Sequence, residues 1–83
     1  MEKIALVSGG ARGIGRAAVE IFIEQGFKVI ILDRDGEELN KTCKQIVGVV
    51  PFNYDVSDEN SMKEISSRID SEFGRLDCLI NNA

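Results

Sequence analysis

The feature that most limits what this chain can fold into is the glycine-rich segment SGGARGIG at residues 8–15. Residues 4–7, directly before it, have the continuous hydrophobicity of a strand buried on both faces. The apolar residues that recur at helical spacing after it are Ile14, Ala17, Ala18, Ile21 and Phe22. We expect these five to form the buried stripe of a helix that Gly26 ends. A strand, a glycine turn and a helix in this order predict the opening unit of a parallel sheet.

Strand and helix patterns continue to alternate along the rest of the chain. Residues 29–32, 47–52 and 76–80 read as three further strands. Asp35 can cap a second helix, and Ser57 or Asp58 a third. The expected apolar faces are Leu39, Cys43 and Ile46 on the second helix, and Met62, Ile65, Ile69 and Phe73 on the third, which Gly74 ends. The order βαβαβαβ predicts one α/β domain over residues 1–83 with a parallel sheet and right-handed crossovers.

Pro51 indicates the order of the strands. Proline cannot donate a hydrogen bond to an internal ladder, so the third strand should lie at an edge of the sheet. A Rossmann-like doubly wound sheet, truncated to four strands in the order 3-2-1-4, places it there. The first two helices then cover one face and the third helix covers the other. A ligand crevice should open where the first and fourth strands end, beside the glycine turn and residues 81–83.

Three glycines of the turn fit the requirements of a dinucleotide pyrophosphate. Gly9 lets the chain leave the strand in a conformation that a Cβ would obstruct, and Gly13 lets the phosphates approach the backbone. Gly15 lets the helix pack closely against the sheet. The unpaired N–H groups and the dipole at the helix start favour an anion there. The alternative is a tight turn with a purely structural role.

Asp33 follows the second strand, 18 positions after Gly15. An acid at this place accepts hydrogen bonds from the hydroxyls of the adenosine ribose and repels a 2′-phosphate, which favours NAD over NADP. Arg12 and Arg34 favour the opposite choice, since each could pair with that phosphate. The alternative for Asp33 is a helix-capping or solvent-facing acid. Asp55, after the third strand, could accept from the adenine amino group, or be an ordinary loop acid.

Composition excludes several classes of partner. The net charge is −4, with no histidine and no basic cluster, which argues against nucleic acid and anionic membranes. No apolar run approaches the ~18 residues of a membrane span. Cys43 and Cys78 lack metal-site spacing, so we expect two reduced thiols and no metal. These features together predict a cytoplasmic protein.

The motifs together resemble the N-terminal part of a short-chain dehydrogenase/reductase, over all 83 residues. Residues 8–15 are similar to that family's Thr-Gly-x-x-x-Gly-x-Gly turn, and residues 74–83 to the segment that runs into its Asn-Asn-Ala-Gly motif. The resemblance implies that Gly9, Gly13 and the backbone of Ile14 line the pyrophosphate and the nearby nicotinamide side. It implies that Asp33 holds the adenosine ribose, and that Asp55 and Val56 hold adenine. It also implies that Asn81 and Ala83 stabilise the fourth strand and flank the cofactor. An arginine in the place of Arg12 also occurs in NADP-using relatives.

The family's catalytic Ser, Tyr and Lys are expected after Ala83. The chain's one tyrosine, Tyr54, has Asp58 rather than lysine four positions later. The resemblance therefore implies the cofactor-binding part of an enzyme that moves a hydride between a nicotinamide dinucleotide and an alcohol or carbonyl. We expect no useful turnover from these 83 residues alone.

Two other functions stay open from the sequence. One is a half-domain that binds the nucleotide without catalysis, and the other is a half-sheet that assembles with a copy of itself. The fourth strand would present an unpaired edge beside exposed apolar surface. We therefore expect self-association, pairing with another polypeptide through this strand, or marginal folding.

Overall fold

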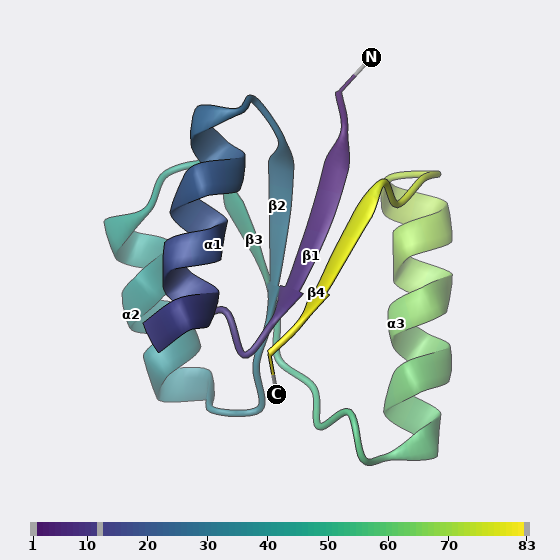
Figure 1. The fold of residues 1–83 in the computed structure, drawn as a ribbon. Helices are drawn as coiled ribbons and strands as arrows, with labels where there is room; N and C mark the ends of the chain where they lie inside the picture. Colours follow the sequence, from purple (N-terminus) through teal and green to yellow (C-terminus); the bar gives the residue numbers. More distant parts are fainter. Residues whose placement is uncertain (1, 12, 83) are drawn as a thin grey trace.

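A computed structural model describes residues 2–11 and 13–82. The expectations for Arg12 and Ala83 thus lie outside the described residues. The elements, in chain order, are β1 (Ile4–Ser8), α1 (Gly13–Glu24), β2 (Lys28–Leu32), α2 (Gly36–Gln45), β3 (Val49–Phe52), α3 (Glu59–Glu72) and β4 (Cys78–Asn81). This order confirms the predicted βαβαβαβ pattern (Figure 1).

The strands form one parallel sheet in the order β3-β2-β1-β4, as predicted. In the register, Leu6 of β1 lies opposite Ile30 of β2 and Leu79 of β4. Helices α1 and α2 cover one face of the sheet and α3 covers the other (Figure 1). All four strands therefore end at the same edge, where the glycine turn leaves β1.

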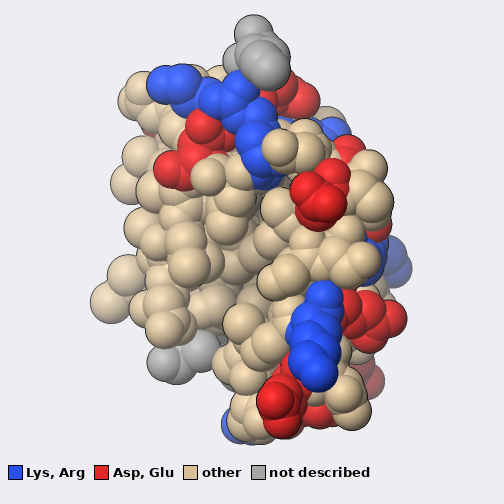
Figure 2. All heavy atoms as spheres, turned by 90° about the vertical axis from the view of Figure 1, so that its right-hand side faces the viewer, with Lys and Arg blue, Asp and Glu red and all other residues tan. Residues whose placement is uncertain are grey.

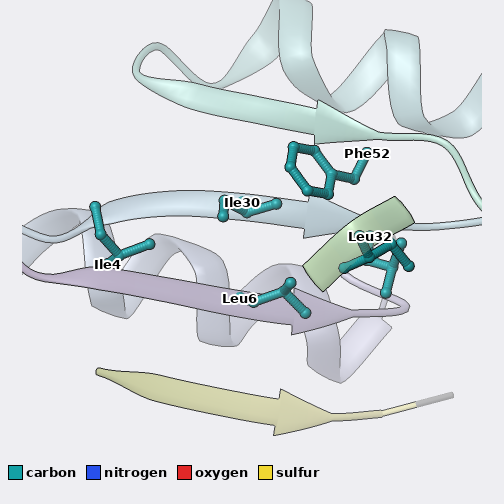
Figure 3. Close-up of a cluster of buried hydrophobic side chains, with 6 residues drawn as sticks. Ile4, Leu6, Ile30, Leu32 and Phe52 are labelled. Carbon is teal, nitrogen blue, oxygen red and sulfur yellow. The ribbon is translucent and has the colours of Figure 1, made fainter. Parts of the chain in front are cut away.

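Alternate residues of the strands divide the core into two clusters. The cluster under α3 consists of Ile4, Leu6, Ile30, Leu32, Phe52 and Ile65. Figure 3 shows five of these side chains on three neighbouring strands, with the ring of Phe52 above β2. The cluster under α1 and α2 consists of Val7, Val19, Val29, Ile31 and Leu39. The two central strands, β1 and β2, are thus covered on both faces, which is why their sequences are continuously apolar.

The buried stripe of α1 differs from the expected one. Gly15 and Val19 are buried, whereas Ile14 is 81% exposed and Ile21 is 59% exposed. Phe22 still packs against the cluster under α1 and α2. The helix is turned so that Gly15 faces inward, because this glycine has to lie against the turn that precedes the helix. The apolar spacing alone did not reveal that constraint.

Strand β3 lies at an edge, which confirms the position inferred from Pro51. It begins at Val49 rather than at residue 47. Gly48 has a φ of +91°, which an extended strand cannot include, and Val47 is 90% exposed in the turn before it. The strand is therefore two residues shorter than predicted.

Strand β4 also begins two residues later than expected, at Cys78. The side chain of Asp77 explains the difference. Its Oδ2 accepts a hydrogen bond from the Ile4 N–H at 2.8 Å, in the place of a strand carbonyl, and its N–H donates to the Ile4 carbonyl at 2.8 Å. Arg75 donates to the same carboxylate.

The helix caps follow the sequence closely. The carboxylate of Asp35 accepts from the Glu38 N–H at 3.2 Å, as predicted for a cap of α2. Of the two candidates for α3, Asp58 is the cap, and its side chain accepts from the Asn60 N–H. Ile46 lies just past α2 in an extended conformation, although it was expected within the helix.

Met62 was expected on the buried face of α3 but is 46% exposed. It lines an apolar groove of about 460 Å³ between α3 and the β1–β4 side of the sheet. Leu76 and Leu79 line the same groove and are exposed as well. The apolar spacing on α3 therefore continues over a surface that no described element covers.

Candidate functional site

A groove of about 610 Å³ opens where β1, β2 and β3 end. Its lining residues are Ser8, Gly9, Leu32, Asp33, Arg34, Asp35, Tyr54, Asp55, Val56, Ser57 and Asn82. Five predicted site residues are among them: Gly9, Asp33, Arg34, Asp55 and Val56. The parallel sheet brings these residues together because Gly9 follows the carboxyl end of β1, Asp33 and Arg34 follow that of β2, and Asp55 and Val56 follow that of β3.

The backbone of the glycine turn has the conformations that were expected of it. Gly9 has a φ of +66°, and its N–H donates to the Leu32 carbonyl at 2.7 Å. Gly13 has a φ of +59°, and a Cβ added there would meet no atom within 4 Å. The first residue of α1 therefore presents bare backbone to open space, and an anion can reach the N–H groups at the start of this helix.

Gly15 permits close packing, but against different neighbours from those expected. A Cβ at Gly15 would collide with the carbonyl oxygen of Gly9 and would lie 2.8 Å from the Asn82 Nδ2. The close approach is thus to the turn and to the end of β4. Both distances are below any that a real Cβ shows, so only glycine fits here without movement.

Gly10 makes the close contact with the sheet, and sequence reasoning did not single it out. A Cβ there would lie 2.9 Å from Ile31 Cγ2 and 3.2 Å from Val19 Cγ2. The signal was present in the sequence, since two adjacent glycines follow β1 and only the first was needed for the turn. Nearby, the buried Thr42 hydroxyl donates to the Ala11 carbonyl at 2.8 Å and ties α2 to the turn.

Asp33 lines the groove and is held by its neighbours. Its Oδ1 accepts from the Asp35 N–H at 3.0 Å, and its own N–H donates to the Phe52 carbonyl at 3.1 Å. Asn53 Nδ2 donates to the Asp33 carbonyl at 2.9 Å. These bonds fix the carboxylate beside the groove, where it can accept from a hydroxyl.

Asp55 forms a small turn of its own. Its Oδ1 accepts from the Ser57 hydroxyl at 2.7 Å and from the Ser57 N–H at 3.0 Å. These two bonds, with the nearby charge of Arg34, lower the pKa of the Asp55 carboxyl below its ordinary value. The carboxylate is therefore ionised at neutral pH and acts only as an acceptor.

Ser8 connects the ends of β1 and β4. Its hydroxyl donates to Asn81 Oδ1 at 3.0 Å and accepts from the Asn82 N–H at 3.2 Å. Asn81, predicted as a site residue, thus lies at the strand end as expected but lines the apolar groove beside α3. Asn82, which the sequence analysis placed beside the crevice only as part of residues 81–83, lines the candidate groove.

The family follows from comparison with known proteins. The sequence model of the short chain dehydrogenase family matches residues 3–83. This chain belongs to that family. Among its relatives, L-fucose dehydrogenase of Bos taurus is 38% identical over 81 residues, which are 98% of this chain and 30% of the relative.

Solved structures give the same result. A short chain dehydrogenase from Bacillus anthracis is 32% identical, with a TM-score of 0.89 over 98% of this chain and 34% of the other. The L-sorbose reductase of Gluconobacter frateurii, complexed with NADPH and L-sorbose, is 28% identical, with a TM-score of 0.90 over 99% of this chain and 33% of the other. The 83 residues thus span about a third of the length of these relatives.

The membrane prediction can be compared with the structure in one respect. Among residues 2–11 and 13–82, no helix is both long and apolar enough to cross a bilayer. The cytoplasmic location inferred from composition stays a prediction.

Proposed function

We propose that this chain binds the nicotinamide dinucleotide of an oxidoreductase, with the adenosine half in the groove at the strand ends. The observation that carries the proposal is the convergence of Gly9, Asp33 and Asp55 on one groove. Carboxylates at two neighbouring strand ends suit the hydroxyls of ribose and the amino group of adenine, which are hydrogen-bond donors. Membership of the short chain dehydrogenase family supports the same ligand.

The pyrophosphate would lie at the start of α1. Gly13 leaves the backbone there open, and Gly9 and Gly15 hold the turn against the helix. Two phosphate charges would then face the positive end of the helix dipole. We propose that the backbone of the exposed Ile14 lines the pyrophosphate and the nearby nicotinamide side. Arg12 is proposed as a residue that could pair with a 2′-phosphate, and Ala83 as one that stabilises the fourth strand and flanks the cofactor.

NAD is the proposed form of the cofactor. Asp33 is fixed beside the groove, and its negative charge would repel a 2′-phosphate. Arg34 lines the same groove and is the residue that could reverse this preference. The L-sorbose reductase that is similar to this chain has NADPH bound, so the alternative form of the cofactor also fits this fold.

The choice of cofactor can be measured with Asp33→Ser, compared with Asp35→Ser as a control on the neighbouring acid. We expect the first variant to lose affinity for NAD and to gain affinity for NADP in calorimetric titrations. Equal affinities of the unaltered chain for both forms, unchanged in Asp33→Ser, would contradict the role of Asp33.

The reaction of the whole protein is proposed at the level of its class. It would move a hydride between the nicotinamide and an alcohol or carbonyl substrate. Within these 83 residues no tyrosine is followed by lysine four positions later. We therefore propose that they supply cofactor binding without turnover, and that mixing them with NAD and a secondary alcohol yields no NADH.

We also propose that the chain associates through β4. Its outer edge has no partner strand among the described residues, and Leu79 on it is 60% exposed. Figure 2 shows an uncharged, hollowed area in the centre and left of the side that carries α3, with charged groups at the top, along the right and at the bottom. Such an edge beside apolar surface favours pairing.

Sedimentation measures this association directly. Leu79→Lys should shift the chain toward the monomer, whereas Val47→Lys, an equal change at an exposed site away from β4, should not. A monomer at every concentration of the unaltered chain would refute the proposed pairing.

A further inference from the structure

Tyr54 connects the candidate groove to α3. It lines the groove directly before Asp55 and Val56, the residues proposed for adenine. Its ring packs edge-to-face on Phe52, with 6.0 Å between the ring centres. Its hydroxyl accepts a hydrogen bond from Arg68 Nη1 at 3.3 Å. One side chain of α3 thus contacts a residue of the groove.

The guanidinium of Arg68 contacts three other side chains. Its guanidinium carbon lies 4.0 Å from the centre of the Phe52 ring and 6.0 Å from that of Tyr54. Its Nε donates to Glu72 Oε2 at 2.7 Å. Phe52 is fully buried, so the stacked guanidinium has a rigid base. Arg68 therefore does more than form a surface ion pair with Glu72, since it also contacts two aromatic rings.

We propose that Arg68 is a positioning residue for the adenine end of the nucleotide groove. It does not line the groove, and it acts by holding the Tyr54 ring, which sets the place where the chain turns into Asp55. This inference rests on the proposed function. It adds that part of the affinity for adenine depends on a residue of α3 that does not itself line the groove.

The composition of the chain provides a direct probe. Tyr54 is the only tyrosine and there is no tryptophan, so the intrinsic emission of the 83-residue chain reports this one ring. The test variant is Arg68→Met. Its matched control is Lys63→Met, which removes one positive charge from an exposed position on the same helix.

The probes are ADP, which carries adenine, and inorganic pyrophosphate, which reports only the glycine turn. We expect Arg68→Met to bind ADP about three- to fivefold more weakly, a loss that stays within the energy of the cation–ring contact that the variant removes. Pyrophosphate affinity should match that of Lys63→Met. The emission of Tyr54 should also become easier to quench with acrylamide, at an unchanged content of helix.

Each result decides the question. If ADP affinity and quenching in Arg68→Met equal those of Lys63→Met, Arg68 has no positioning role, while binding by the unaltered chain keeps the proposed function. If the unaltered chain binds neither ADP nor NAD, the proposed function fails, and this inference fails with it. If Arg68→Met unfolds, Tyr54→Phe tests the same contact, because it removes only the hydroxyl that accepts from Arg68. This variant should lose affinity for ADP but not for pyrophosphate. An unchanged ADP affinity in Tyr54→Phe would overturn the inference.

Discussion

Replacing Gly15 by alanine tests how tightly the glycine turn and α1 fit together. The new Cβ would collide with the Gly9 carbonyl oxygen and approach the Asn82 Nδ2 to 2.8 Å. Two of its three nearest atoms belong to the Gly9 backbone, which cannot rotate away as a side chain can. The helix start and the turn must therefore move apart.

The magnitude follows from two opposing effects. Overpacking costs about 1–3 kcal/mol, and the rigid neighbours favour the upper half of that range. Alanine within a helix is about 1 kcal/mol better than glycine. The net loss in the free energy of unfolding is then about 1–2 kcal/mol, and each kcal/mol lowers the melting temperature of a chain this size by about 4–8 °C.

The assay pairs thermal unfolding with NAD titration. Because the displaced segment would form the pyrophosphate site, we expect about a tenfold loss of NAD affinity, or about 1.4 kcal/mol. The control is Gly36→Ala at the start of α2, where a Cβ lies an ordinary 3.4 Å from Asn53 Oδ1. Because it has the same helix gain without the overpacking, it should raise the free energy of unfolding by up to about 1 kcal/mol and leave NAD affinity unchanged. A Gly15→Ala variant as stable as Gly36→Ala, with full NAD affinity, would refute the reasoning.

Three further substitutions test the framework around the site. Phe52→Ala empties a fully buried position and should cost about 3–5 kcal/mol in urea unfolding, most of the stability of a chain this size. Thr42→Val leaves the buried Ala11 carbonyl without its hydroxyl donor and should cost about 1–3 kcal/mol, whereas Thr42→Ser should cost less. The hydrogen bonds from Arg75 and from the Ile4 N–H lower the pKa of the Asp77 carboxyl below its ordinary value of 3.8. The ionised carboxylate therefore contributes its full stabilisation above pH 3.8, and this stabilisation is lost as the pH falls through the lower pKa of the folded chain. Asp77→Asn should therefore lower the urea midpoint at neutral pH and show a smaller further loss on acidification to about pH 3 than the unaltered chain.

The sequence predicted the sheet because its strong signals are local. Continuous apolar runs, capping acids such as Asp35 and Asp58, and the edge position of Pro51 each depend on nearby backbone chemistry. The predicted first residues of β3 and β4 were wrong for equally local reasons, which the hydrophobic pattern does not show. Gly48 adopts a positive φ, and the side chain of Asp77 replaces a strand hydrogen bond.

The candidate groove was predictable in part. Gly9, Asp33 and Asp55 follow strand ends, and a parallel sheet gathers strand ends at one edge. The contacts that depend on residues far apart in the chain were not predictable. Ser8 reaches residues 73 and 74 positions away, and Gly10 and Gly15 are required by side chains and backbone that only the folded chain brings near.

The most direct test of the account is a titration of the ¹⁵N-labelled chain with NAD, followed by its amide resonances. Dinucleotide binding at the strand ends predicts saturable shifts at Gly9, at residues 13–15, at Asp33 and at residues 55–57, all of which lie along the glycine turn and the groove. The amides on the exposed side of α3 should not move. Saturation with no shift at these positions, or shifts confined to the apolar groove beside α3 and β4, would contradict dinucleotide binding at the strand ends.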